Sequence, residues 1–436
     1  MNWQDIHDQA IVFDWHNHGT LKNFLFDRSL DGKDSRFLTR LFKRSFWPLS
    51  ERNTLPKMKE GGLNVVLSTS YIPEIEWVDD QKLIKFLKWL YPSVNKRVFQ
   101  PTYFDATNAM MDRMEKEVEL YNETSLNKTE VGGGISGASI GETISQPDNK
   151  FVFVKSIKEL EDAIVNSDIA MIHSVEGGHS LNGELAKKRV EESTALKPLV
   201  ENELLKNLEH FYDRGVAYLT LAHFYPNHLV SPVFPYPEYG IKKSNWKQLM
   251  AGWDMNKGLT SIGKKVVEAM KDMGMIIDIT HCTPKARSEV YDIVGNDLSK
   301  VIASHIGAFS VNPDPLNLED WEIKWLADHN CLMGIIFMNY WLSPIDSGLG
   351  LKHIERTIDH IINIAGDQVL AIGTDFDGFT DPPDEITDIS ELPRFTRYLS
   401  SFRSGINEDK YSNTTITNIL GRNSLRFILE GWGKKK

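Results

Sequence analysis

Cysteine is scarce in this 436-residue chain, which contains only Cys282 and Cys331. Two cysteines are too few for a disulfide-stapled scaffold, and too few for a zinc site made of four cysteines. Disulfide-rich folds and zinc ribbons are therefore excluded, and a reducing compartment is the simpler expectation.

Long hydrophobic runs are also missing, because no window reaches the roughly 18 consecutive apolar residues of a transmembrane helix. The first residues, MNWQDIHDQAIVFDWHNH, show no basic start, no apolar core and no small-residue cleavage site of a signal peptide. We therefore expect a cytoplasmic protein without a membrane partner.

An excess of positive charge is lacking as well. Lys and Arg number 49 against 60 Asp and Glu, which gives a net charge of −11. A net negative surface disfavours binding to nucleic acid or to anionic membranes. The hydrophobic fraction of 41% allows a large core, and α/β barrels of this length often form one domain.

What the sequence does have is a series of short, β-branched, apolar runs. They lie at 11–13, 63–68, 169–172, 217–221, 275–279, 301–303, 332–338 and 369–372. Such runs suit strands that are covered on both faces, as in parallel sheets. Between these runs, apolar residues recur at helical intervals, for example at 259–273 before Gly274 and at 354–364 before Gly366. This alternation predicts one α/β domain over residues 1–436, a (β/α)8 TIM barrel.

The spacing of the runs is uneven between the second and the third. We expect an insertion there at about 75–160, helical at first, in which the glycine-rich stretch VGGGISGASIGE (131–142) forms a loop over the site. No Walker pattern is present and no GxGxxG follows a strand, so these glycines do not predict a phosphate site. The stretch 413–429 predicts a closing helix.

Side chains of metal-ligand type follow five of the predicted strands. They are His16 and His18, then Glu176, His281, His305 and Asp375. Because all strands of a barrel point the same way, their C-terminal ends meet at one face, where active sites lie. Taken alone, each of these residues is more often a core or surface group than a ligand. Together they predict a metal centre.

Imidazole and carboxylate ligands without cysteine suit Zn²⁺, with Mn²⁺, Fe²⁺ and Co²⁺ as alternatives. This number of ligands is enough for two divalent ions if one carboxylate bridges them. Two ions would polarise a carbonyl and lower the pKa of a bridging water to about 7. Asp375 is placed to orient that water and to carry its proton to a leaving amine.

Several longer motifs resemble the membrane dipeptidase (renal dipeptidase) family of zinc peptidases, within the amidohydrolase superfamily. SVEGGHSL resembles its bridging-glutamate motif, and GLTSIGKKVVEAMKDMGMIIDITH resembles the helix and strand that end in a metal histidine. SHIGAFSVNPDPLNLED resembles the segment of the other metal histidine, IGTDFDGF the catalytic aspartate motif, and LGRNSLRFI the C-terminal signature. The resemblance covers most of the chain.

The resemblance implies a role for each matching residue. His16 and His18 would bind the first metal, Glu176 would bridge both, and His281 and His305 would bind the second. Asp375 would handle the proton. His223, in LTLAHFYPNH, would contact the substrate and steady the tetrahedral intermediate; the alternative is a strand-end histidine that caps the barrel.

Two positions depart from the family pattern. His18 stands where the family usually has aspartate, which removes one negative charge from the site. Leu316 stands where the family has an arginine that pairs with the substrate's terminal carboxylate, and leucine cannot make such a charge-assisted pair.

These observations support a zinc-dependent hydrolase with two metal ions that cleaves the amide bond of dipeptides or related small acyl-amino compounds. Leu316 keeps open another substrate, such as a lactone, a lactam or an N-acyl amino acid. His18 keeps open a non-catalytic or tailoring relative that retains the barrel. The expected partner is a small molecule, and a homodimer is compatible with the sequence.

Overall fold

The computed structural model describes residues 2–32, 51–76, 94–131, 149–187, 197–233, 253–298, 300–343, 350–378, 381–401 and 410–433. Within these residues the chain forms one parallel sheet of nine strands. The strands are β1 (Phe13–Asn17), β2 (Val65–Tyr71), β3 (Phe151–Phe153), β4 (Ile169–Glu176), β5 (Tyr218–Thr220), β6 (Ile276–Asp278), β7 (Val301–Ile306), β8 (Leu332–Ile336) and β9 (Leu370–Gly373).

Eight of these strands close into a barrel. The ring is completed by β2 and β4, which pair in parallel from Val65 opposite Ala170 to Tyr71 opposite Glu176. The strand β3 lies outside the ring and pairs with the beginning of β4. The predicted (β/α)8 barrel is therefore confirmed, with one short strand that the sequence pattern did not indicate.

Burial explains why the barrel strands read as continuous apolar runs. Every residue of the eight barrel strands is buried. The barrel interior covers one face of each strand and the helices cover the other, as expected for an all-parallel sheet.

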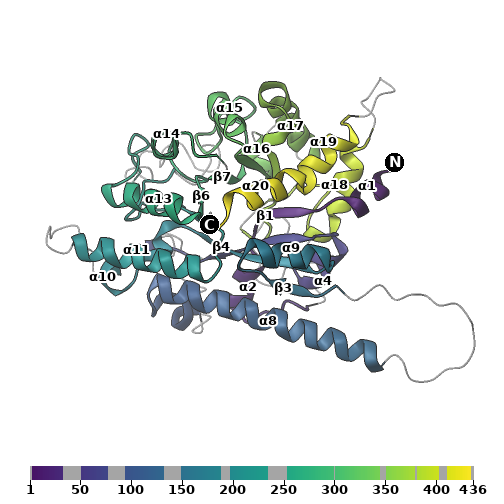
Figure 1. Ribbon diagram of the computed structural model, residues 1–436, viewed down its shortest axis with the longest axis horizontal. Coiled ribbons are helices and arrows are strands. Elements are labelled where there is room, and N and C mark those ends of the chain that lie inside the picture. Colours follow the sequence, from purple (N-terminus) through teal and green to yellow (C-terminus); the bar gives the residue numbers. More distant parts are fainter. Residues whose placement is uncertain are drawn as a thin grey trace, which may run out of the picture.

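Helices surround the barrel on its outside (Figure 1). Those that follow the barrel strands are α2 (Gly19–Phe26), α4 (Leu55–Glu60), α8 (Tyr103–Val131), α11 (Lys197–Asp213), α13 (Ser261–Met273), α14 (Pro284–Val294), α15 (Asp320–Asp328), α17 (Leu351–Ala365) and α18 (Leu392–Leu399). The remaining helices are α1 (Trp3–Gln9), α9 (Ile157–Val165), α10 (Glu184–Lys187), α16 (Asn339–Leu342), α19 (Asn413–Thr417) and α20 (Asn423–Gly431), with short 3-10 and π segments between them.

The two helices singled out from the sequence both form. The helix α13 begins after Thr260, whose hydroxyl caps the Gly263 N–H at 2.9 Å, and it ends at Gly274 in the left-handed conformation. The helix α17 ends at Gly366. The closing helix of 413–429 is interrupted, because α19 and α20 are joined by the π segment Asn418–Arg422.

The segment between β2 and β4, where a helical insertion was expected, contains a short strand as well as helices. The helix α8 runs along one side of the molecule, and β3 and α9 follow it (Figure 1). The glycine-rich stretch lies, after Val131, outside the described residues.

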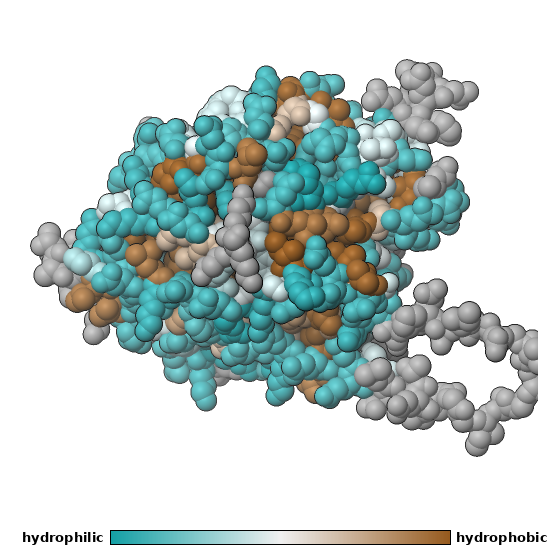
Figure 2. All heavy atoms as spheres, viewed as in Figure 1, coloured by the Kyte–Doolittle hydropathy of each residue, from teal (hydrophilic) through white to brown (hydrophobic). Residues whose placement is uncertain are grey.

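The face shown in Figure 2 is mostly hydrophilic, with separate hydrophobic patches. Large hydrophobic residues are seldom exposed among the described residues; examples are Val165, Leu120 and Trp321. None of the described helices combines the length and the apolar character that crossing a membrane requires.

Candidate metal centre

The C-terminal ends of the barrel strands bring the five predicted metal ligands together. His16 and His305 lie near the ends of β1 and β7, and Glu176 is the last residue of β4. His18 follows β1 directly, and His281 lies in the turn after β6. All five side chains are nine-tenths buried or more.

The carboxylate of Glu176 stands at the centre of this cluster. Its Oε1 lies 3.4 Å from His16 Nε2, 3.2 Å from His281 Nε2 and 3.5 Å from His305 Nε2. Its Oε2 lies 3.1 Å from His18 Nε2. One carboxylate thus faces four imidazoles, three on Oε1 and one on Oε2.

Hydrogen bonds behind the cluster fix which nitrogen of His16 carries its proton. The Tyr218 hydroxyl donates to the Trp15 carbonyl at 2.8 Å and lies 2.8 Å from His16 Nδ1. Since its proton is used, it accepts from Nδ1–H, and Nε2 of a neutral His16 presents a lone pair.

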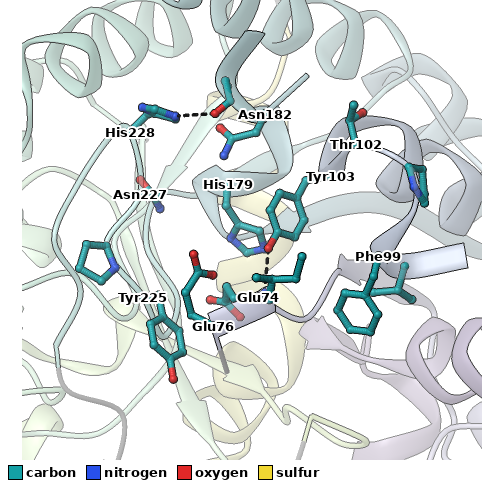
Figure 3. Close-up of a pocket in the computed structure, with 15 residues that line it drawn as sticks. Glu74, Glu76, Phe99, Thr102, Tyr103, His179, Asn182, Tyr225, Asn227 and His228 are labelled. Carbon is teal, nitrogen blue, oxygen red and sulfur yellow. Dashed lines mark hydrogen bonds between the residues drawn. The ribbon is translucent and has the colours of Figure 1, made fainter. Parts of the chain in front are cut away.

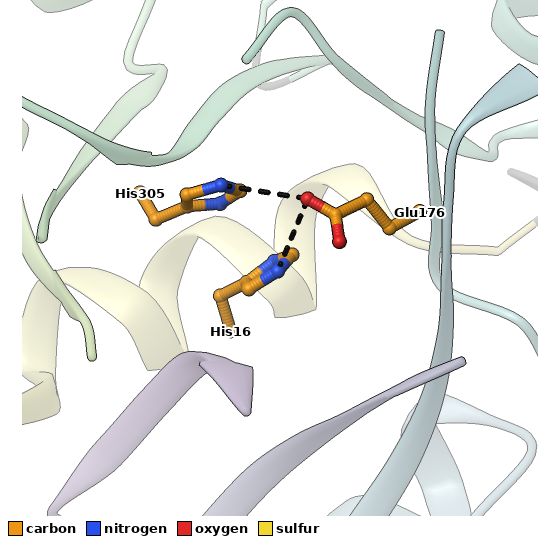
Figure 4. A group of neighbouring side chains, drawn as sticks. All are labelled: His16, Glu176 and His305. Carbon is orange, nitrogen blue, oxygen red and sulfur yellow. Dashed lines mark ion pairs between the residues drawn. The ribbon is translucent and has the colours of Figure 1, made fainter. Parts of the chain in front are cut away.

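The same reasoning applies to His305. The Ser304 hydroxyl donates to Asp278 at 2.7 Å and lies 2.8 Å from His305 Nδ1. Two nitrogen lone pairs therefore converge on one carboxylate oxygen (Figure 4). Lone pairs facing an anion repel one another unless a cation lies between them, so the donor set fits a metal ion.

Asp375 and His223 border the same cluster. Asp375 Oδ1 lies 3.3 Å from His18 Nε2 and 3.9 Å from His16 Nε2. His223 Nε2 lies 3.9 Å from Glu176 Oε2. Both side chains lie close enough to the predicted ligands to share an ion with them. One group that could hold an ion is His16, His18 and Asp375, and another is Glu176, His223 and His281.

The backbone at two of these residues is strained. His281 has φ of 66° and Asp375 has φ of 54°, both in the left-handed region that residues other than glycine rarely adopt. The Asp375 carboxylate lies so close to Gly378 that a Cβ there would be 2.0 Å from Oδ1, so only glycine leaves room for it. Strain of this kind clusters at functional sites, where the fold maintains it.

The charges of the cluster follow from burial and from the facing groups. Burial alone would raise the pKa of Glu176, but positive charge on the facing imidazoles, His16 and His223 first, outweighs it and holds that pKa well below its usual range. A bound cation would supply this positive charge in their place and leave the imidazoles neutral. Burial lowers the pKa of His18, but hydrogen bonds to Asp375 and Glu176 outweigh it and raise that pKa to about 10. Glu176 is therefore an anion at neutral pH, as a ligand for a divalent cation must be.

Two neighbouring cavities open at this face. A cavity of about 40 Å³ is lined by side chains of the cluster together with Tyr71, Phe224, Met338, Tyr340, Trp341 and Gly378. A cavity of about 510 Å³ is lined by Glu74, Glu76, Tyr103, His179, Tyr225 and others (Figure 3). The small cavity has room for reacting groups alone, and the large one has the size of an ordinary ligand pocket.

Leu316 takes no part in either cavity. It is 2% exposed and packs in the hydrophobic core, while Arg287 donates to the carbonyls of the two flanking residues, Pro315 and Asn317. No lysine or arginine appears among the described residues that line the small cavity.

Sequence reasoning missed the residues that orient these side chains. Tyr218 and Ser304 orient His16 and His305, and Glu74 accepts a hydrogen bond from His223. Glu74 had a usable signal, because it follows the second strand just as the predicted ligands follow theirs. Tyr218 had none, because it lies inside an apolar run.

The protein is a closed parallel (β/α)8 barrel whose histidines and carboxylates gather at the C-terminal face, as in barrel proteins with a metal centre. The chain belongs to the membrane dipeptidase family (peptidase family M19), whose family model matches residues 2–431. This confirms the resemblance seen in the sequence motifs.

Two curated relatives match part of the chain. An uncharacterised protein in the pqqA 5′ region of Klebsiella pneumoniae is 34% identical over 182 residues, 41% of this chain and 63% of that protein. An uncharacterised dipeptidase of Schizosaccharomyces pombe is 29% identical over 220 residues, 50% of this chain and 47% of that protein. The matches thus span about half to two thirds of these relatives' lengths.

The fold is shared over the whole chain with solved structures. A metallopeptidase from Rhodobacter sphaeroides, liganded with a phosphinate mimic of the dipeptide L-Ala-D-Ala, superposes with a TM-score of 0.62. The superposition covers 97% of this chain and 100% of that one, at 17% identity. At this low sequence identity, the superposition shows a common fold and nothing about activity.

Proposed function

We propose that the protein is a zinc-dependent hydrolase with two metal ions that cleaves the amide bond of dipeptides or related small acyl-amino compounds. His16 and His18 would hold one ion, His281 and His305 the other, and Glu176 both. The observation that carries this is the gathering of four imidazole Nε2 atoms within 3.1 to 3.5 Å of the Glu176 carboxylate. When bound, the two ions polarise the scissile carbonyl and make a neighbouring water nucleophilic near neutral pH.

The protein's own side chains complete the reaction. Asp375, held at the edge of the small cavity, accepts a proton from the attacking water and delivers it to the leaving amine nitrogen. His223 faces the same cavity through Nε2. With a second proton on Nε2, its imidazolium would donate a hydrogen bond to the carbonyl oxygen as negative charge develops there. The small cavity excludes bulk water from these groups, and the larger cavity beside it takes the remainder of the substrate.

Elemental analysis combined with a dipeptide panel tests this proposal. We expect two equivalents of zinc per chain and hydrolysis that falls at least about 100-fold in His281→Ala. A protein without a stoichiometric transition metal, or a His281→Ala variant that hydrolyses as the wild type does, would contradict it.

A second candidate is a substrate without a free terminal carboxylate, such as a lactone, a lactam or an N-acyl compound. It is supported by the burial of Leu316 and by the lack of lysine and arginine among the described residues that line the small cavity. Dipeptides with free and with amidated C-termini separate the two candidates. Turnover of both at equal rates favours the second, and a strong preference for the free carboxylate favours the first.

A further inference from the structure

Glu74 lies three residues beyond the end of β2 and makes an unusually complete set of hydrogen bonds. Its side chain is 4% exposed. It accepts the Tyr71 hydroxyl at 2.6 Å and the Phe224 N–H at 3.0 Å, and its Oε1 lies 3.0 Å from His223 Nδ1. The buried carboxylate is thus held by its own strand and by the loop after β5.

This contact decides the orientation of His223. A carboxylate can only accept hydrogen bonds, so His223 Nδ1 must carry the proton that is shared with Glu74. Nε2 is then the ring nitrogen left to face the small cavity, where it lies 3.9 Å from Glu176 Oε2. Burial alone would raise the pKa of Glu74, but nearby His223 and His179 outweigh it and hold that pKa well below its usual range.

Neighbouring rings restrict His223 from its other sides. Its ring stacks on Phe224 at 3.8 Å between centroids, with Tyr71 at 4.2 Å and His281 at 4.7 Å. Packing therefore fixes the plane of the ring, while Glu74 selects which edge points inward. A ring turned over in the same plane would present a carbon atom where Nε2 now lies.

We propose that Glu74 is the positioning residue for His223, holding the ring so that Nε2 faces the reacting atoms of the substrate. This inference rests on the proposed hydrolase function. Glu74 acts on the reacting atoms through the imidazole and makes no hydrogen bond to any of the five predicted metal ligands; its own edge lines the larger cavity.

Glu74→Gln tests the role with little change of shape. The glutamine oxygen can keep the His223 and Phe224 bonds only with its NH2 turned onto the Tyr71 hydroxyl. The bond to His223 then loses its charge-assisted character, so the ring is held less firmly in this orientation. We expect kcat to fall about 10- to 100-fold, as is usual when the partner of an active-site histidine is removed. KM should stay within about threefold and the metal content unchanged, because the predicted ligands keep their own partners.

A matched control is Glu115→Gln. Glu115 also pairs with a buried histidine, His173, at 2.9 Å, but this pair lies between α8 and the outside of β4. The control should keep the wild-type kcat. Tyr71→Phe removes one donor to Glu74 and should lower kcat in the same direction by a smaller factor, which keeps the test open if Glu74→Gln does not fold.

A double variant isolates the path through His223. In a His223→Ala background, adding Glu74→Gln should change kcat by less than about twofold, since the residue it positions is gone. Side-chain ¹⁵N NMR of the histidines, with His223 assigned from the His223→Ala spectrum, should show the Nδ1–H form in the wild type. Glu74→Gln should shift the ring towards the Nε2–H form, because the charge-assisted bond that selects Nδ1–H is gone.

The outcomes are distinct. Loss of metal in Glu74→Gln, a change in KM alone, or a full additional effect in the His223→Ala background overturns the positioning role. A wild-type spectrum without the Nδ1–H form overturns it independently of activity. A wild type that holds no metal and hydrolyses nothing overturns the proposed function, and the positioning role with it, even if the Nδ1–H form is present.

Discussion

Replacing Tyr218 by phenylalanine tests the hydrogen bonds behind the metal centre. The change removes one hydroxyl from the barrel interior and keeps the ring. That hydroxyl donates to the Trp15 carbonyl and accepts from His16 Nδ1, both at 2.8 Å. In the variant the nearest alternative acceptor for His16 Nδ1 is Ser304 Oγ at 3.3 Å, whose own proton goes to Asp278.

The magnitude follows from these contacts. A buried polar group that loses its partner costs about 1–3 kcal/mol, and His16 keeps a weaker acceptor, so the free energy of unfolding should fall by about 2 kcal/mol. His16 also loses the group that fixes its tautomer and direction, so zinc affinity should fall about 10- to 100-fold. Competition with a chromophoric chelator measures the affinity, and urea unfolding of the metal-free protein measures the stability.

Tyr291→Phe is the matched control, because Tyr291 is equally buried and its hydroxyl donates to Glu322 at 3.1 Å, far from the centre. It should lose stability of the same order and keep the zinc affinity of the wild type. If Tyr218→Phe binds zinc within about twofold of the wild type, the tautomer argument for His16 is wrong.

Three further predictions concern stability. Arg287→Met leaves the buried Glu322 carboxylate without a cation where both side chains are 1% exposed, so urea unfolding should show a loss of about 3–5 kcal/mol, and a loss below about 1 kcal/mol would contradict the importance of this pair. Gly421→Ala places a Cβ 2.1 Å from the Ile11 carbonyl oxygen and should cost about 1–3 kcal/mol in thermal unfolding, whereas an unchanged midpoint would show that the close approach relaxes freely. The hydrogen bond from His173 lowers the pKa of Glu115 from 4.5 to about 2, so its stabilisation is present above pH 4.5 and is lost as the pH falls towards 2. Because Glu115 is partly exposed to water, Glu115→Gln should cost about 1 kcal/mol at pH 6, and this difference should shrink on acidification; a constant difference would refute the assignment.

The sequence predicted the barrel well because apolar runs report burial on both faces. Its boundaries were less accurate where polar ligands lie inside strands. The strand β1 continues to Asn17, beyond the predicted run 11–13, and β7 continues to Ile306, beyond 301–303. The buried Asp14 in β1 and the buried Ser304 and His305 in β7 look like the end of an apolar run, although the strand goes on. Phe151–Phe153 was missed because its pairing with β4 depends on the chain returning from α8.

The predicted ligands and their orienting partners differ in what the sequence can reveal. A ligand follows from one rule, that polar side chains at strand ends meet at one face of a barrel, and this rule needs no knowledge of which strands face each other. An orienting partner depends on the register across the barrel: Tyr218 on β5 reaches His16 on β1, and Asp278 on β6 reaches His305 on β7 through Ser304. Glu74 lies between these cases, because the rule of strand ends applies to it. The rule would have pointed to Glu74 had it been applied to the second strand, whereas its contact with His223 required the structure.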